Sequence, residues 1–358
     1  MNVQTRKDMT EFFTKNLTKF SKEFQQNMDS EEDLSTESLR TYIIESNIPS
    51  LNKISLNGFF VDIKDTQDTT LKIISITEKK ENKKIKIFCD TFDKRFWSLH
   101  SVDDGHLINK FVEALVSQNR SQFDFPWLFN EFMHKLSSFG TNESFSIKFR
   151  NEFLQSKSDV DDINKLAMRF WGNNGKKIID ELDKVSVLER GMSLSNLGVK
   201  IHNNGSFIND NITHKGKFTV VGGDSINDHY HLINKVRASY SKVISNIESN
   251  SLNYIIKDQK VNIEGEPIII EFNKEIKDLK FFIEVITSSR QPFRIWGLPE
   301  FLHDDFASIS AIDLHSGDKI DIEATKKWLR IYLPKGSCGN IITRLLTNIQ
   351  HYFDSKTK

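Results

Sequence analysis

The chain has few cysteines and no long apolar run. Among its 358 residues only Cys89 and Cys338 are cysteines, too far apart for a CxxC or zinc-ligand spacing. This excludes a disulfide framework and favours a reducing compartment. No window approaches the roughly 20 apolar residues of a transmembrane helix, and residues 1–8 lack the apolar core of a signal peptide. We therefore expect a cytoplasmic protein that does not enter a membrane.

The chain also lacks a net charge and the common nucleotide-binding motifs. Lys and Arg together number 49, as do Asp and Glu, so no global field attracts nucleic acid. Nucleic-acid binding would need a local basic patch, such as the four lysines of 79–84. The sequence contains no full P-loop, dinucleotide fingerprint or nucleophile elbow. It therefore indicates no cofactor, and a divalent metal only if the protein is a hydrolase.

What the chain has in quantity is phenylalanine. Hydrophobic residues make up only 38% of the sequence, but 28 residues are Phe. Each buried ring removes a large apolar area from water, which predicts a folded protein with a phenylalanine-rich core. Helical and alternating patterns occur in both halves and predict an α+β fold with two mixed domains, 1–155 and 156–358. The second domain is expected to rest on a largely antiparallel sheet with flanking helices.

Hydrophobic periodicity predicts the individual elements. An amphipathic helix is expected over 8–28, and its apolar stripe consists of Met9, Phe13, Leu17, Phe20, Phe24 and Met28. This helix either docks on its own domain or binds a protein partner. We expect short helices at 36–46 and 160–171 and a strand at 280–286. Further helices are predicted at about 103–116, 127–139, 175–184, 225–247 and 341–353, and strands at 54–64, 70–78, 83–92, 144–150, 252–257, 267–272, 292–296, 308–315, 319–323 and 328–333.

Residues 222–231 lead into the helix expected at 225–247. Asp224 or Ser225 is a natural N-cap, because its side-chain oxygen can accept from a free backbone N–H. We interpret His229 and His231, which follow, as surface histidines. The alternative is a metal site, because Asp224, Asp228 and His231 would share one face of the helix.

The C-terminal segment from residue 328 onward has the clearest structural pattern in the sequence. It consists of a strand, a glycine loop at 334–340 and an amphipathic helix. Free backbone N–H groups and the helix dipole at such a position can hold an anion. The anion ligands that we expect are Lys335, Gly336, Gly339, Asn340 and Arg344. The alternative is a plain turn in which Asn340 caps the helix.

Asp313 and His315 lie two residues apart on a predicted strand, so both side chains face the same way. A carboxylate beside an imidazole suits a divalent metal. The order DxH, GDxxD, GN resembles the motifs of the binuclear metallophosphoesterases, which would imply metal-dependent hydrolysis. However, one residue separates His315 from Gly317, so Ser316 to Asp318 is better explained as a hairpin turn.

Arg344 and His351 lie on the final helix with six residues between them. This spacing is similar to that of the HEPN ribonucleases, in which the pair polarises a phosphodiester and shuttles protons. Those enzymes are all-helical, whereas this helix follows a strand, and Leu345 stands where a polar residue is usual. The candidate catalytic residues of a hydrolase are therefore Asp313, His315, Arg344 and His351.

The leading functional hypothesis is a non-enzymatic interaction or regulatory subunit of a bacterial-type cytoplasmic assembly. It rests on the absence of a convincing catalytic set, the helix at 8–28 and aromatic residues near turns, as in Phe125-Pro-Trp127. Defence against foreign nucleic acid is one setting for such a subunit. The alternatives are a metal-dependent or HEPN-like nucleic-acid or nucleotide hydrolase, and a binding module for a phosphorylated small ligand.

Overall fold

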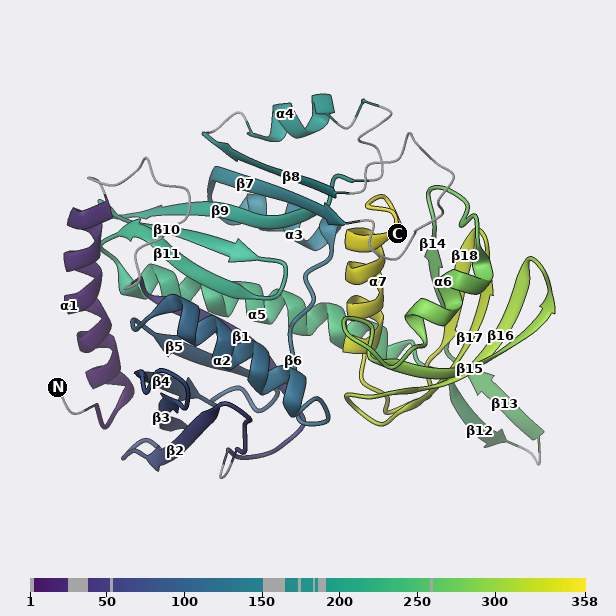
Figure 1. The fold of residues 1–358 in the computed structure, drawn as a ribbon, viewed down its shortest axis with the longest axis horizontal. Coiled ribbons are helices and arrows are strands. Elements are labelled where there is room, and N and C mark those ends of the chain that lie inside the picture. The colour runs from purple at the N-terminus through teal and green to yellow at the C-terminus, as the bar shows by residue number, and fades with distance from the viewer. Residues whose placement is uncertain are drawn as a thin grey trace. The chain divides into compact units, whose positions relative to one another are not determined.

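The computed structural model describes residues 3–24, 38–51, 54–150, 165–172, 175–182, 184–185, 191–257 and 260–358. Its helices accompany antiparallel sheets, so the predicted α+β class is confirmed (Figure 1). The chain forms two compact units, each assembled from several stretches of sequence. Unit 1 comprises Met1–Pro126, His134–Ser144 and Asn196–Arg237, and unit 2 comprises Trp127–Met133, Phe145–Ser195 and Ala238–Lys358. The predicted domains 1–155 and 156–358 group the chain differently, and their boundary lies outside the described residues.

An antiparallel sheet forms the middle of unit 1. Its hydrogen-bonded order is β2-β3-β4-β5-β1-β11-β10-β9, and β9 is followed by β7. The bounds are β1 (Arg40–Ser46), β2 (Phe59–Asp65), β3 (Leu71–Glu78), β4 (Lys84–Asp90), β5 (Phe96–Ser101), β7 (Thr141–Arg150), β9 (Leu194–Asn203), β10 (Ser206–Thr213) and β11 (Lys217–Gly223). The short β6 (Phe123–Asp124) pairs with β1.

Tight turns fix the register of these strands. Asn204 and Gly205 join β9 to β10 with φ of 47° and 86°, the left-handed backbone that a two-residue hairpin needs. Gly216, between β10 and β11, has φ of 70°, and a Cβ there would lie 2.3 Å from Cγ of Pro126. Only glycine fits this position without displacing the proline.

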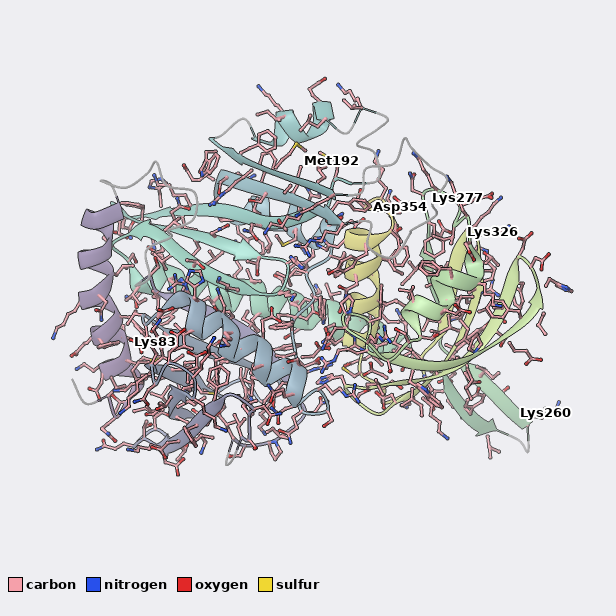
Figure 2. All side chains as sticks on the ribbon, viewed as in Figure 1. Lys83, Met192, Lys260, Lys277, Lys326 and Asp354 are labelled. Carbon is pink, nitrogen blue, oxygen red and sulfur yellow. The ribbon has the colours of Figure 1, made fainter. Side chains whose placement is uncertain are left out.

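The lysine-rich segment 79–84 contains the turn of the hairpin between β3 and β4. Lys83, labelled in Figure 2, is exposed and lies 2.7 Å from the Glu81 carboxylate. One acidic side chain thus already pairs with this lysine, and nucleic-acid binding by a basic patch here stays a prediction.

Two helices and the start of a third pack in unit 1. Helix α1 (Arg6–Phe24) buries Met9, Phe13 and Leu17 in a cluster that also contains Val220 of β11. Met9, Phe13 and Leu17, the described part of the apolar stripe, are therefore covered by their own unit. Partner binding through 8–28 stays a prediction, and residues 25–28 lie outside the described part. Helix α2 (Gly105–Gln118) begins after Asp104, which is its N-cap. Helix α5 (Ile226–Ser249) begins in unit 1 and ends in unit 2.

Unit 2 contains a five-stranded antiparallel sheet with helices packed on it. The strand order is β14-β18-β17-β16-β15. The bounds are β14 (Ile268–Glu271), β15 (Ile295–His303), β16 (Phe306–Asp313), β17 (Lys319–Thr325) and β18 (Trp328–Tyr332), with α6 (Leu279–Ile286) and α7 (Asn340–Tyr352). The core of this unit has the expected phenylalanines, with Phe282 and Phe353 packed edge to face at 4.7 Å.

The remaining elements of the chain are β8 (Lys165–Trp171), α3 (Asn130–Leu136), the 3₁₀ turn Ser137–Phe139, α4 (Gly175–Leu182) and the hairpin of β12 (Asn253–Lys257) with β13 (Lys260–Glu264).

Three predicted elements are wrong. Residues 36–46 were expected to be a helix, but Arg40–Ser46 is a strand whose residues are all buried. A strand buried on both faces shows no alternation, so periodicity alone cannot identify it. Residues 160–171 were also expected to be a helix, but Lys165–Trp171 is a strand, and its Phe170 stacks on Phe145 at 4.7 Å. Pairing between strands here overrides the helix propensity of Leu, Ala and Met.

The third wrong prediction is the strand at 280–286, which is helix α6. Asp278 caps this helix by accepting a hydrogen bond from the N–H of Phe281. Leu279, Phe282 and Ile286 then fall on one buried stripe. A short apolar run fits both a strand and a helix, and here the cap decides for the helix.

Within the described ranges, no helix combines the length and the apolar character needed to cross a bilayer.

Candidate functional site

Two of the predicted C-terminal residues meet in a buried ion pair of unit 2. Asp313 and Arg344 have no exposed surface, and Nη2 of Arg344 donates to Oδ1 of Asp313. The Nε of Arg344 donates to the backbone carbonyl of Phe293 at 2.9 Å. Oδ2 of Asp313 accepts from the N–H and hydroxyl of Ser316 at 2.8 and 3.0 Å. The pair therefore fixes α7 to the turn after β16, which is a structural task.

The two predicted histidines have separate surroundings. The backbone N–H of His315 donates to Asp313 at 3.1 Å. Nδ1 of His351 lies 3.2 Å from the backbone carbonyl of Lys148. A hydrolase needs its catalytic groups to face a shared, accessible space, whereas Asp313 and Arg344 are fully enclosed. Catalysis by these four residues stays a prediction.

Two backbone N–H groups of the glycine loop at 334–340 already donate hydrogen bonds to other residues of the chain. The N–H of Cys338 donates to Asp318 at 2.8 Å, and that of Gly339 donates to Glu248 at 2.8 Å. Two carboxylates thus already occupy the position where an anion was expected. Lys335 and Gly336 are exposed, and the predicted anion site stays a prediction.

Asn340 does not cap the final helix. Gly339 is the N-cap and makes no side-chain cap bond. Instead, the buried side-chain oxygen of Asn340 accepts a hydrogen bond from the hydroxyl of Tyr240. Tyr240 also accepts from the N–H of Trp127 at 3.0 Å, so Asn340 belongs to a polar cluster inside unit 2.

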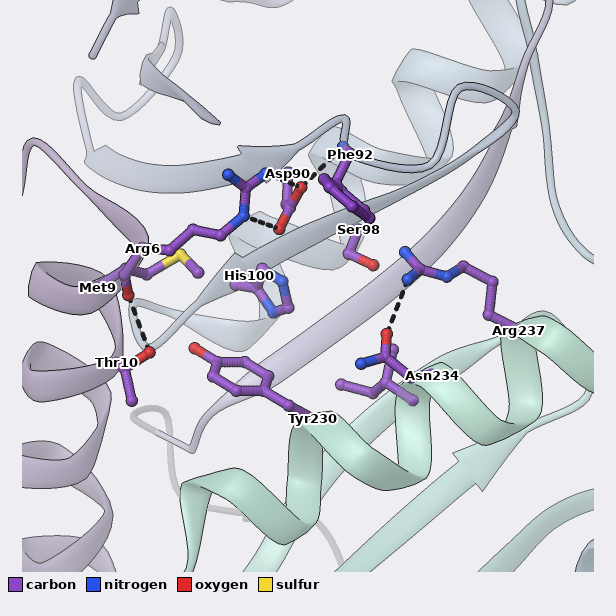
Figure 3. A pocket seen from close by; sticks show the side chains of 11 residues that line it. Arg6, Met9, Thr10, Asp90, Phe92, Ser98, His100, Tyr230, Asn234 and Arg237 are labelled. Atoms are coloured by element: carbon purple, nitrogen blue, oxygen red, sulfur yellow. Dashed lines mark hydrogen bonds and ion pairs between the residues drawn. The ribbon is translucent and has the colours of Figure 1, made fainter. Parts of the chain in front are cut away.

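Unit 1 holds a cavity of about 320 Å³, which we call the unit 1 cavity (Figure 3). Its lining residues are Arg6, Met9, Thr10, Asp90, Phe92, Ser98, His100, Tyr230, Ile233, Asn234 and Arg237. They project from one stripe of α1, one stripe of α5, the facing part of β4 and β5 and, for Phe92, the turn between these two strands. Residues three and four apart on a helix share a face, which explains the two helical stripes. The volume is that of a small-molecule site.

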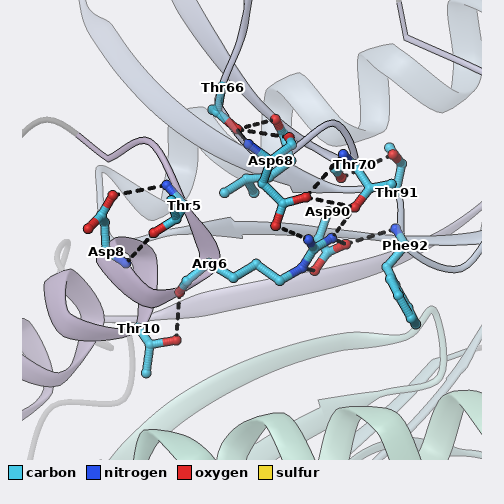
Figure 4. Close-up of polar contacts among 11 residues, drawn as sticks. Thr5, Arg6, Asp8, Thr10, Thr66, Asp68, Thr70, Asp90, Thr91 and Phe92 are labelled. Carbon is cyan, nitrogen blue, oxygen red and sulfur yellow. Dashed lines mark hydrogen bonds and ion pairs between the residues drawn. The ribbon is translucent and has the colours of Figure 1, made fainter.

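One end of the cavity is closed by Arg6 at the start of α1 (Figure 4). Its Nε and Nη2 donate hydrogen bonds to the two carboxylate oxygens of Asp90, at 2.9 and 2.6 Å. Nη1 bonds Asp68, and Nη2 also donates to Thr70 at 2.6 Å. The Asp90 carboxylate raises the pKa of Arg6, and the guanidinium lowers the pKa of Asp68. Arg6 therefore ties α1 to the sheet, and its ring contact with Phe92 extends the cavity wall.

The other end carries Arg237 and Asn234, one turn apart on α5. Nη2 of Arg237 donates to the Asn234 side-chain oxygen at 2.7 Å, which leaves the Asn234 amide hydrogens as donors. The Nε of Arg237 lies 3.7 Å from the Asp93 carboxylate, a long ion pair compared with that of Arg6.

A buried chain of hydrogen bonds ends at the cavity. Both carboxylate oxygens of Asp210 lie within 3.0 Å of Nδ1 of His229. Nε2 of His229 lies 2.9 Å from the hydroxyl of Thr41, which lies 2.8 Å from Nδ1 of His100. None of the four side chains is more than 3% exposed. Thr41 and His100 face each other across β1 and β5, so the sheet register sets their approach.

Burial controls the protonation of the cavity wall. It lowers the pKa of His100 to about 3, with a further contribution from the charge of His229, so this imidazole is neutral near pH 7. Burial also raises the pKa of Tyr230, an effect that Thr10 partly offsets. The Tyr230 hydroxyl is enclosed and makes no hydrogen bond of normal geometry with any residue in the described part of the chain.

Sequence comparison places the chain in a family. The model of the MJECL33-like proteins matches residues 1–358. The chain belongs to the MJECL33-like family. A relative described as "Uncharacterized protein MJECL33", from Methanocaldococcus jannaschii, is 31% identical over 359 residues, which cover 89% of this chain and 85% of the relative.

In this member of the MJECL33-like family, sequence patterns did not indicate the unit 1 cavity. The prediction that His229 is a surface histidine is wrong, because α5 lays this side chain on the sheet and leaves it no exposed area. Thr41 and His229 are 188 residues apart in sequence. The available signal was weak, namely a titratable residue inside a strand, such as His100 in β5 and Asp210 in β10.

Proposed function

We propose that this chain is a non-enzymatic regulatory protein that binds a small molecule in the unit 1 cavity. The observation that carries the proposal is the composition of the cavity wall. Met9, Phe92 and Tyr230 offer apolar and aromatic surface, while His100, Asn234 and Arg237 offer polar groups. Ligand sites generally combine such walls with a few convergent polar groups.

The polar groups of the cavity are mainly donors. The Asp90 carboxylate is engaged by Arg6 and by the N–H of Phe92 at 2.8 Å, so it offers little to a ligand. Arg237 and the Asn234 amide have hydrogens to donate. A ligand with an oxyanion and a flat apolar body fits this wall. This supports the predicted class of phosphorylated small ligands, at a place other than the glycine loop.

Binding to small aromatic anions tests the proposal. The thermal unfolding of the whole chain would be followed with phenyl phosphate, benzoate, orthophosphate and benzylamine at millimolar concentration. A ligand at 100 times its Kd stabilises the native state by about 2.7 kcal/mol, a readily measured shift in Tm. We expect stabilisation by phenyl phosphate or benzoate and a smaller effect of benzylamine.

The matched variants are Arg237→Gln, in the cavity, and Arg330→Gln, which removes a half-exposed arginine paired with Glu323 in unit 2. Only the first should reduce the stabilisation. Absence of a shift with every probe, or equal shifts in both variants and the wild type, would refute the proposal. The assembly that such a regulatory subunit would serve, its cytoplasmic location and a role in defence against foreign nucleic acid stay predictions from sequence.

A further inference from the structure

The buried chain Asp210–His229–Thr41–His100 determines which hydrogen-bonding group His100 presents to the unit 1 cavity. A carboxylate only accepts hydrogen bonds, so Nδ1 of His229 must carry a hydrogen toward Asp210. The remaining question is the state of Nε2 of His229, which faces the Thr41 hydroxyl.

A fully buried carboxylate is costly unless a positive partner compensates it. The only ion pair of Asp210 in the described part of the chain is with His229, at 2.8 Å, and both side chains have no exposed surface. A protonated His229 makes this pair neutral overall, whereas a neutral His229 leaves one buried negative charge. The charges farther out, Arg6 of α1, Asp90 of β4 and Arg237 of α5, also act on the neighbouring His100.

In the protonated form of His229, Nε2 carries a hydrogen, and this hydrogen determines the direction of the other hydrogen bonds in the buried chain. Thr41 accepts from it and, having one hydroxyl hydrogen, donates that hydrogen to Nδ1 of His100. His100 is neutral, so its single ring hydrogen sits on Nε2. This nitrogen makes no hydrogen bond with the residues that the structure describes, and His100 lines the cavity between the Arg6–Asp90 pair and Tyr230 (Figure 3).

From this geometry we propose that the unit 1 cavity recognises an aromatic oxyanion, a carboxylate or a phosphate, whose oxygen accepts from Nε2–H of His100. This inference rests on the proposed function and specifies its ligand chemistry. Arg237 and the Asn234 amide supply further donors to the same group. A neutral imidazole donor favours oxygen acceptors, since a bound ammonium would face the N–H of His100 and the positive charge of Arg237.

The first test is the tautomer of each histidine in the ligand-free chain, measured at pH 7 by long-range ¹H–¹⁵N NMR. His100→Gln and His229→Gln spectra assign the two signals. We expect His229 to be protonated on both nitrogens and His100 on Nε2 alone. A His100 protonated on Nδ1 alone would overturn the inference, whatever the cavity binds.

The second test compares His100→Gln with His100→Met, two side chains of similar length. Both lose the imidazole link to Thr41, but only glutamine keeps an N–H donor near the position of Nε2. The dissociation constants of benzoate and phenyl phosphate, measured separately, show which oxyanion is preferred. We expect the methionine variant to bind the preferred probe about tenfold more weakly than the glutamine variant, as for loss of a hydrogen bond to a charged group.

The outcomes separate the two proposals. If no probe binds the wild-type chain, the small-molecule function fails, and the ligand inference fails with it. If probes bind but the two His100 variants are equal, or benzylamine binds more tightly than benzoate, only the oxyanion inference fails. A circular dichroism melt of each variant confirms that a lost affinity is measured on folded protein.

Discussion

His100 should make the fold sensitive to acid. The imidazole has a pKa of 6.5 in a solvated chain and of about 3 in the native protein, chiefly because it is buried. As pH falls below 6.5, the unfolded state gains a proton that the native state does not take up until pH approaches about 3. This group therefore contributes stability that is present above pH 6.5 and is lost progressively as the solution becomes more acidic.

The magnitude follows from the two pKa values. Between a pH of about 7 and a pH of about 4.5, proton binding to the unfolded state should lower the free energy of unfolding by about 2.5 kcal/mol through this one side chain. Urea denaturation across this range would give the profile for the wild type and for His100→Asn, which does not titrate. The variant should be less stable near neutrality but should lose about 2.5 kcal/mol less on acidification.

His303→Asn, which removes an exposed histidine of β15, is the matched control. Parallel profiles for the wild type and His100→Asn would refute the reasoning, because they would show that His100 titrates alike in the native and unfolded states.

Three further predictions concern the other contacts. Arg344→Met leaves Asp313 buried without its ion-pair partner and should cost about 3–5 kcal/mol in urea denaturation; replacing both residues with apolar ones should cost less than the two single changes added together. Lys335→Ala should leave the binding of orthophosphate and phenyl phosphate unchanged in calorimetry, since carboxylates already accept from the adjacent N–H groups of the loop. A loss of affinity in this variant would instead support the loop as an anion site. Asp104→Ala removes the cap of α2, which accepts from two backbone N–H groups, and should lower the free energy of unfolding by about 1 kcal/mol; an unchanged value would show that the cap is dispensable.

Much of the fold could be predicted because its signals are local. The glycine turns between β9, β10 and β11, the Asp104 cap and the hairpin tip at 79–84 each depend on a few adjacent residues. Helix α6 and strand β1 were mistaken because both are short and largely buried, so their composition fits either element. The Asp278 cap decides for a helix in α6. Pairing with the neighbouring strands β5 and β11 decides for a strand in β1.

The candidate site was harder to predict because its residues are distant in sequence. Asp313 and Arg344 do meet, in an ion pair without exposed surface, and their catalytic role stays a prediction. The chain from Asp210 to His100 depends on strand order and on the position of α5, and no spacing in the sequence encodes it. Only a titratable residue inside a strand, such as His100 or Asp210, hints at it.

The most direct test of the central claim is a crystal structure of the whole chain grown with phenyl phosphate. The account predicts the ring against Tyr230 and Phe92, with a phosphate oxygen about 3 Å from Nε2 of His100, the distance of a hydrogen bond. An empty unit 1 cavity, or phenyl phosphate bound at the loop 334–340 instead, would contradict it.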